Sequence, residues 1–129
     1  MKYLKLYEFF RNETDDKIDE LNEEWQKISN RLYKESISVK ANIGLKDYTD
    51  ISLFLMDIKS LKDIPGLGTK GMNELISFAD KHNLPTWLLA SSNYGSDLDR
   101  LVKFYERFGF VYVGEYGNIG KEMYRKNNI

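Results

Sequence analysis

The chain has 129 residues, of which 42% are hydrophobic and 30% are charged, with a formal net charge of −1. This length and balance predict one globular domain over residues 1–129, and the near-neutral charge argues against nucleic-acid binding driven by bulk charge. There is one histidine, no cysteine, no apolar run of membrane-spanning length and no signal-peptide pattern. These absences exclude disulfide bonds and cysteine nucleophiles, argue against zinc, and lead us to expect a cytoplasmic protein with no metal and no membrane span.

The first segment, residues 2–10, is compatible with two structures. Leu4 and Leu6 alternate with Lys5 as in a strand. Leu6 and the aromatic residues around it would also line one face of a helix. Both interpretations stay open on this pattern alone.

A long amphipathic helix follows, from Thr14 to about Lys34. Thr14 and the two aspartates after it supply capping oxygens and the acidic first turn that helices favour. Apolar residues then recur every three or four positions, at Ile18, Leu21, Trp25, Ile28 and Leu32. We predict that this stripe packs on a sheet, so that only the loops at its ends could reach a substrate.

Two strands come next, joined by a turn over residues 44–50. Residues 37–43 alternate apolar and polar side chains, which predicts a half-exposed strand. Residues 51–58 are apolar on both faces at their centre, as in a strand covered on both sides. Because a short turn joins them, we expect the two strands to pair antiparallel.

A glycine turn then leads into a second helix, from about Thr69 to His82. Gly66 and Gly68 allow the backbone to turn tightly and to direct free N–H groups outward. Such groups, together with the helix dipole, form a site for phosphate. Asn83 suits a left-handed position after the helix, and Pro85 prevents the helix from continuing.

The remaining elements are a strand, a helix and two more strands. Residues 86–90 form a short apolar strand, and the order strand, crossover helix, strand predicts a parallel pair with strand 51–58. Parallel strands that diverge at their carboxyl ends leave a crevice for a ligand. A helix ends at Gly109, and residues 110–113 and 121–125 are the last predicted strands.

Two motifs in this part of the chain resemble the acyl-CoA-binding core of the GNAT superfamily of N-acyltransferases. That superfamily has an [Arg/Gln]-x-x-Gly-x-[Gly/Ala] turn, which cradles the CoA pyrophosphate. Gly66 and Gly68 match the two small positions, whereas Asp63 stands where Arg or Gln is expected. Asn93 and the run from Leu101 to Phe110 are similar to the superfamily's Asn…Tyr-x-x-x-Gly-Phe ending. The resemblance covers roughly the last two-thirds of the chain.

The resemblance implies a fold and an activity. The fold is α/β (mixed α+β), a central mixed twisted sheet of about six strands with helices on both faces, and residues 2–10 would form its first strand. The activity is the transfer of an acetyl group from acetyl-CoA, a cosubstrate, to a primary amine by direct attack. The acceptor is a small molecule or a protein, and we also consider a homodimer. The stretch before the glycine turn is shorter than in typical members.

The resemblance also implies site residues. The end of strand 51–58 would hydrogen-bond the pantetheine arm through its backbone, and the glycine turn would hold the pyrophosphate. The implied cofactor-binding residues are Met56, Asp57, Ile58, Asp63, Ile64, Pro65, Gly66, Leu67, Gly68, Thr69, Lys70, Asn93 and Tyr105. The implied catalytic residues are Tyr105, as the acid that protonates the leaving thiolate, and Asp57, as the nearest candidate base.

Each assignment has an alternative. Tyr105 also completes the apolar stripe of its helix, and Asp57 could be a solvated residue at a strand end. The three glycines Gly66, Gly68 and Gly71 match the dinucleotide pattern G-x-G-x-x-G, but several residues separate the strand from the first glycine, and no acid ends the next strand. The glycines could also only form a tight loop, and the fold could serve as a non-catalytic protein-interaction module.

Overall fold

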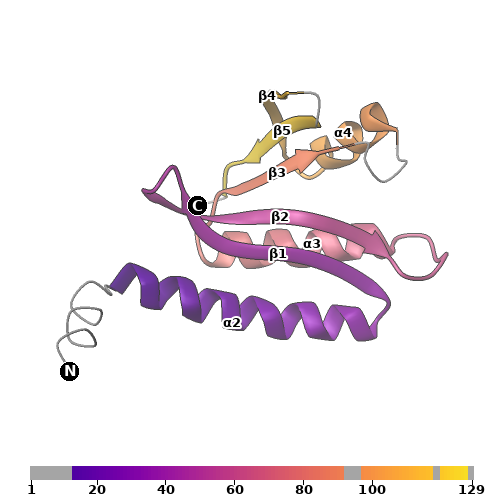
Figure 1. Ribbon diagram of the computed structural model, residues 1–129. Helices are drawn as coiled ribbons and strands as arrows, with labels where there is room; N and C mark the ends of the chain where they lie inside the picture. Colours follow the sequence, from indigo (N-terminus) through magenta and orange to yellow (C-terminus); the bar gives the residue numbers. More distant parts are fainter. Residues whose placement is uncertain (1–12, 92–96, 118–119, 128–129) are drawn as a thin grey trace.

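The computed structural model describes residues 13–91, 97–117 and 120–127. This part of the chain forms a five-stranded mixed sheet and three helices (Figure 1). The elements are α2 (Glu13–Lys34), β1 (Ile37–Lys46), β2 (Asp50–Ser60), α3 (Leu67–Lys81), β3 (Thr86–Ala90), α4 (Leu98–Glu106), β4 (Val111–Tyr116) and β5 (Gly120–Arg125). We expected about six strands. The sixth was residues 2–10, which lie outside the described residues.

The strands are ordered β1-β2-β3-β5-β4. β1 and β2 pair antiparallel, and β2 and β3 pair parallel, so both pairings expected from the sequence are confirmed. β5 pairs antiparallel with β3 on one side and with β4 on the other. This sheet is not the parallel, doubly wound sheet that a dinucleotide fold requires, which removes the dinucleotide interpretation of the three glycines.

One face of the sheet carries the core. Side chains alternate along each strand, so paired residues of neighbouring strands share a face. Leu53 and Leu55 on β2 are buried, as are their neighbours Thr86 and Leu88 on β3. Phe54 and Trp87 point to the opposite face and are half-buried.

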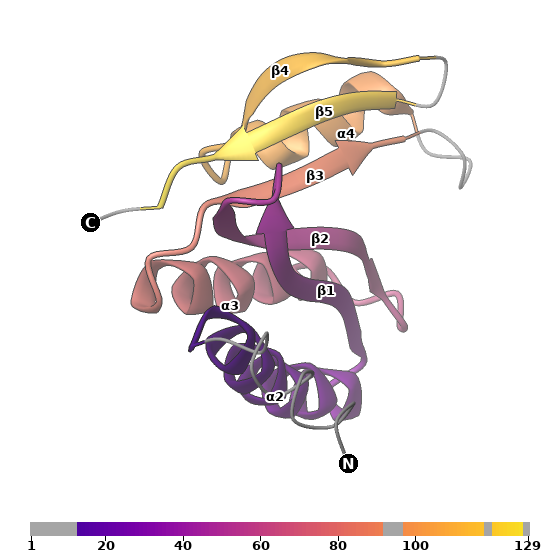
Figure 2. The same ribbon diagram turned by 60° about the vertical axis from the view of Figure 1, so that its left-hand side comes forward.

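The described helices all lie on the core face. α2 and α3 run side by side beneath β1 and β2 (Figure 2), and the rings of Trp25 and Phe78 are 5.4 Å apart across them. α4 joins the same layer, because a Cβ added at Gly68 on α3 would lie 3.8 Å from Phe104 on α4. Helices were expected on both faces. The three that the structure describes lie on one, while residues 1–12 are outside its described part.

Close approach of α3 to the sheet depends on a glycine. A Cβ at Gly71 would lie 2.8 Å from Ile37, 3.0 Å from Val39 and 3.1 Å from Ile58. The helix ends as the sequence predicts, since Asn83 has a φ of 55°. α3 is therefore held tightly under the strand whose carboxyl end forms the site described next.

Candidate functional site

The parallel strands β2 and β3 separate soon after they meet. They pair only over Leu53–Leu55 and Thr86–Leu88, although β2 continues to Ser60 and β3 to Ala90. Within the described residues, the edge of β2 that faces β3 has no backbone partner beyond Leu55. The strand therefore presents unpaired N–H and C=O groups to the space that opens between the two strands.

A β-bulge at Met56 accompanies this separation. Asp57 pairs with Lys40 and Leu55 pairs with Ala41, so Met56 is an extra residue on β2. A bulge bends its strand, increases the local twist and changes which residues face each side of the sheet. Leu55 faces the helices before the bulge, and Ile58 does so after it, beside Gly71. Asp57 consequently points to the opposite side, where strict alternation would have put it in the core.

A cleft of about 430 Å³ occupies the space between the diverging strands. It is lined by Met56, Asp57, Ile58, Lys59, Leu89, Ser91, Leu101 and Tyr105. A second cavity of about 520 Å³ lies on the helix side and is lined by Ile58, Lys59, Ser60, Gly68, Asp97, Arg100, Leu101, Phe104 and Tyr105. The two share Ile58, Lys59, Leu101 and Tyr105. We call these two adjoining cavities together the passage; its lining includes Gly68 at the start of α3 and Met56 and Leu89 on the sheet.

Tyr105 lies where the two cavities meet. Its side chain is only 8% exposed, and its ring packs edge-on against Phe104 and Phe110. Burial, with a smaller contribution from the charge of Asp57, raises the pKa of Tyr105 to about 12. The hydroxyl is therefore neutral at physiological pH, and the carboxylate of Asp57 is close enough to affect it. Tyr105 therefore has a ring that packs in the core, as its place in the apolar stripe predicted, and it also lines the cleft.

The glycine turn begins α3 with an open helix N-terminus. Gly66 has a φ of 88°, and no side chain caps the helix at this position. The first intrahelical bond runs from the amide of Lys70 to the carbonyl of Gly66 at 3.0 Å. The amides of residues 67–69 precede this bond, and N–H groups in such positions, together with the helix dipole, attract anions. Gly68 also lines the cavity that contains Tyr105.

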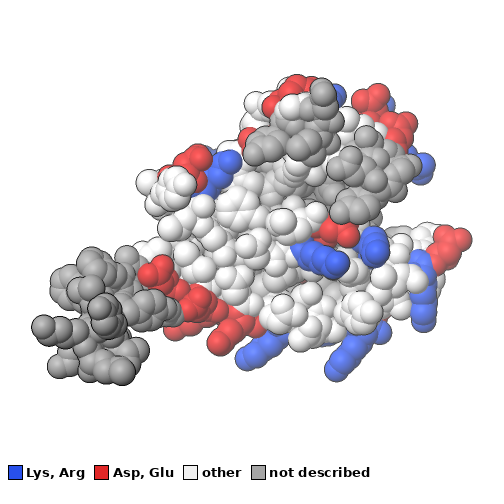
Figure 3. Space-filling view, viewed as in Figure 1, with Lys and Arg blue, Asp and Glu red and all other residues white. Residues whose placement is uncertain are grey.

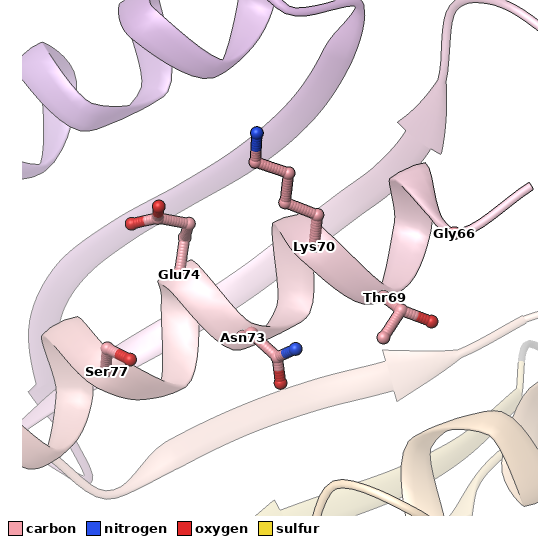
Figure 4. Close-up of a pocket in the computed structure, with 6 residues that line it drawn as sticks. All are labelled: Gly66, Thr69, Lys70, Asn73, Glu74 and Ser77. Carbon is pink, nitrogen blue, oxygen red and sulfur yellow. The ribbon is translucent and has the colours of Figure 1, made fainter. Parts of the chain in front are cut away.

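A shallow groove of about 370 Å³ runs along the outer side of α3 from the same turn. Figure 4 shows its lining residues Gly66, Thr69, Lys70, Asn73, Glu74 and Ser77. Lys70 is directed toward α2 and pairs with Glu35 at 2.8 Å, and Glu74 pairs with Arg31 at 3.1 Å. The Lys70 ammonium, predicted to approach the phosphates, is thus held by a carboxylate away from the turn.

Basic residues nevertheless gather near this end of the molecule. The last turn of α2 carries Arg31 and Lys34, whereas its first turn carries Glu13, Asp15 and Asp16. Figure 3 shows the acidic side chains over one end of α2 and the basic ones toward the other. Arg31 itself is paired with Glu35 at 3.3 Å and with Glu74 at 3.1 Å.

The other predicted site residues divide into three groups. Met56, Asp57 and Ile58 line the cleft. Asp63, Ile64 and Pro65 are exposed in the loop before α3, and Leu67 is half-buried. Asn93 lies outside the described residues.

Several cleft residues were missed by the sequence interpretation, among them Arg100 and Phe104. The helical spacing from Tyr105 could have indicated both, because Arg100, Leu101, Phe104 and Tyr105 lie on one side of α4. Within residues 13–91, 97–117 and 120–127, no group of three or more acidic or histidine side chains could hold a metal ion, and no helix is long and apolar enough to cross a membrane.

Comparison with known proteins gives matches in structure only. No family model and no curated protein matches the sequence. Arabidopsis thaliana Naa50, solved with the bisubstrate analogue CoA-Ac-MVNAL, matches with a TM-score of 0.54 and 16% identity over 68% of this chain and 63% of its own. An acyl-CoA N-acyltransferase from Pseudomonas aeruginosa matches with a TM-score of 0.48 and 20% identity, over 67% and 59%. A Corynebacterium glutamicum structure described as histone acetyltransferase HPA2 and related acetyltransferase matches with a TM-score of 0.47 and 20% identity. The match covers 63% of this chain and 44% of the Corynebacterium chain.

This chain spans less than two thirds of the length of each of these three proteins. At such low identity, the likeness to Naa50 shows a shared fold.

Proposed function

We propose that this chain, which has the fold of the GNAT acyltransferases, transfers an acetyl group from acetyl-CoA to a primary amine. One observation carries the proposal, namely the unpaired edge of β2 beyond Leu55 along a cleft that contains Tyr105. The solved complex of Naa50, which shares the fold, contains a CoA-based analogue. That complex supports a CoA site at the corresponding place.

In this proposal the pantetheine arm lies between β2 and β3. Its two amides pair with the backbone of residues 56–60, in the manner of an added strand. The pyrophosphate binds the amides that begin α3, next to Gly66 and Gly68. Arg100 and Lys59, which line the passage, add positive charge along the way. The thioester then reaches the cleft between Asp57 and Tyr105.

The reaction is a direct displacement. The neutral amine nitrogen forms a bond to the acetyl carbon, and the carbon–sulfur bond breaks with its electron pair leaving on sulfur. Tyr105 donates a hydrogen bond to the leaving sulfur, and the nitrogen loses one proton to Asp57 as it becomes an amide nitrogen. The sulfur then takes a proton from solvent and Asp57 releases one to solvent, so that the net change moves one proton from nitrogen to sulfur.

The raised pKa of Tyr105 limits what this acid can do. A thiol has a pKa of about 8.5, well below the value of about 12 that burial and Asp57 give to Tyr105. Complete proton transfer to a free thiolate is therefore uphill. The hydroxyl contributes most as a hydrogen-bond donor to sulfur while the carbon–sulfur bond is breaking, when a neutral donor in a buried site is most effective.

A second function is favoured by two observations at the glycine turn. Asp63 puts a negative charge on the loop before α3, and Lys70 is paired with Glu35. Both the Asp63 charge and the Lys70–Glu35 pair weaken anion binding. Weak anion binding is expected of a non-catalytic module that uses the fold for protein interaction. Acetyl-CoA binding separates the two functions.

Calorimetric titration with acetyl-CoA and with NAD tests the proposal. We expect binding of acetyl-CoA in the micromolar to millimolar range and none of NAD. CoA release with an amine acceptor would then establish transfer. No binding of acetyl-CoA at millimolar concentration, or equal binding of NAD, would refute the proposal in favour of the non-catalytic module.

A further inference from the structure

The face of the sheet opposite the helices is apolar around the cleft. Met56 is 68% exposed at the bulge, and Leu89 is 38% exposed near the end of β3. Both line the cleft that contains Asp57. Apolar side chains that are exposed together beside a polar group are typical of a surface that binds a ligand.

This apolar surface extends away from the cleft along β3 and β5. Trp87 lies two residues before Leu89 on the same face, and its ring is 4.6 Å from that of Tyr124. Phe54 is the β2 neighbour of Trp87. Phe54, Trp87 and Tyr124 are half-buried and lie side by side next to the cleft mouth.

Charge on this face is arranged for a single cation. Glu122, opposite Leu89 on β5, is paired with Lys46 at 3.6 Å, and Lys46 lies 4.2 Å from the centre of the Trp87 ring. Asp57 is the one carboxylate among the described residues that line the cleft. Lys40, exposed opposite Asp57 on β1, and Lys59, in the cleft wall, are both basic. A polyamine would meet repulsion from these lysines, whereas a monoamine needs only Asp57.

From this arrangement, which rests on the proposed function, we infer that the acceptor is a monoamine with an apolar substituent on or next to the amine-bearing carbon. Asp57 receives the amine, and Met56 and Leu89 contact the substituent. The α-amine of a peptide with an apolar first residue and a small hydrophobic amine share this chemistry. Acceptors rich in charge or hydroxyl groups lack the apolar part that the cleft mouth recognises.

Matched acceptors test the inference. Initial rates of CoA release from acetyl-CoA are measured with leucinamide and with glycinamide, which differ only in the side chain, and with spermidine. We expect kcat/KM for leucinamide to exceed that for glycinamide by at least about tenfold, because a single methylene group in an apolar pocket is already worth about 10- to 200-fold. The value of kcat/KM for spermidine should be lower than that for leucinamide. The values of kcat/KM for a short peptide that begins with leucine and for a simple arylalkylamine are then compared. The comparison shows whether the acceptor is the α-amine of a peptide or a small hydrophobic amine.

Variants locate the selectivity at the cleft mouth. Leu89→Asn and Met56→Gln should each reduce the leucinamide preference to about threefold or less. Calorimetry of Leu89→Asn, which lies outside the proposed acetyl-CoA contacts, should show unchanged affinity for acetyl-CoA. Leu45→Asn is the matched control, because Leu45 is similarly exposed at 39% but lies at the hairpin end of β1, away from the cleft. It should keep the full preference.

The failures of the two proposals are distinguishable. If acetyl-CoA binds but glycinamide or spermidine reacts as well as leucinamide, the inference on the acceptor is overturned and the transferase is not. If both cleft variants keep the wild-type preference, Met56 and Leu89 do not contact the substituent, and the inference is also overturned. If acetyl-CoA does not bind, the proposed function and the inference fall together.

Discussion

Arg125 on β5 donates two parallel hydrogen bonds to the carboxylate of Asp80 on α3. Nη1 lies 2.9 Å from Oδ1, and Nη2 lies 3.1 Å from Oδ2. Nε donates a third hydrogen bond to the carbonyl of Phe108, which follows α4, at 2.9 Å. The arginine side chain is only 8% exposed. This one residue therefore ties the sheet to α3 and to the end of the helix that carries Tyr105.

Removal of the Asp80 carboxylate should destabilise the fold strongly. Asp80→Ala leaves a buried guanidinium without its main counter-charge, a change that typically costs about 3 to 5 kcal/mol. Lys81→Ala is the neighbouring control. It breaks the 3.1 Å pair of Lys81 with Glu24, in which the lysine is 68% exposed, and should cost less than about 1 kcal/mol. Urea unfolding of both variants measures the difference, and equal losses would show that the Arg125 pair contributes no more than a surface pair.

Tyr105 should give the protein a specific sensitivity to alkaline pH. The folded protein holds the Tyr105 proton up to a pKa of about 12, against an ordinary value of 10.0. The stabilisation is complete below pH 10 and is lost as the pH rises toward 12, because the unfolded chain ionises first. Two pKa units correspond to about 3 kcal/mol.

The Tyr105→Phe variant has no hydroxyl to ionise at this position, so it should not lose this stabilisation at alkaline pH. We expect the free energy of unfolding of the wild type, relative to the variant, to fall between pH 10 and pH 12 and to be constant from pH 7 to pH 9. Chemical denaturation across this range measures it. Parallel curves for the two proteins at all pH values would mean that Tyr105 titrates normally.

The same variant tests the chemical role of the hydroxyl. If Tyr105 donates to the leaving sulfur, Tyr105→Phe should lower kcat by on the order of a hundredfold, as the loss of a general acid does. Its affinity for acetyl-CoA should change little, because the ring still packs against Phe104 and Phe110. Steady-state kinetics and calorimetry together separate the two effects. A fully active variant would assign Tyr105 to the core alone.

Asp63 should weaken the binding of CoA. Its side chain is exposed in the loop that leads to Gly66. Two like charges about 6 Å apart repel by nearly 3 kcal/mol at an effective dielectric constant of about 20, before screening by salt. Asp63→Arg should bind CoA more tightly than the wild type, with a larger gain at low ionic strength, and Asp63→Asn should gain less.

The control for this charge change is Asp50→Arg, at the opposite end of β2. It changes the net charge equally and should leave CoA affinity nearly unchanged. Calorimetry of all four proteins at two salt concentrations decides. If Asp63→Arg gains no more than Asp50→Arg, the Asp63 carboxylate does not face the phosphates.

Local sequence patterns predicted most of the elements, because each was encoded by neighbouring residues. The apolar spacing of Leu21, Trp25 and Leu32 predicted the buried face of α2. Asn83 adopts the left-handed conformation that its side chain tolerates. The parallel arrangement of β2 and β3 followed from the crossover helix between them.

The site depended on features that local patterns do not encode. Alternation along β2 would have put Asp57 on the same face as Leu53 and Leu55, and only the bulge at Met56 turns it toward the cleft. The turn between β1 and β2 was expected over residues 44–50, but β1 continues to Lys46 and β2 begins at Asp50. The shorter turn has positive φ angles at Asp47 and Tyr48, which a search for glycine does not find. The raised pKa of Tyr105 results from burial, which the sequence does not state.

A crystal structure of the protein with acetyl-CoA tests the central claim most directly. We predict pantetheine density between β2 and β3, with its amides bonded to the backbone of residues 56–60. The pyrophosphate should lie at the amides that follow Gly66, and the thioester sulfur within hydrogen-bonding distance of Tyr105. Acetyl-CoA bound elsewhere, with the cleft between the strands filled only by water, would contradict the account.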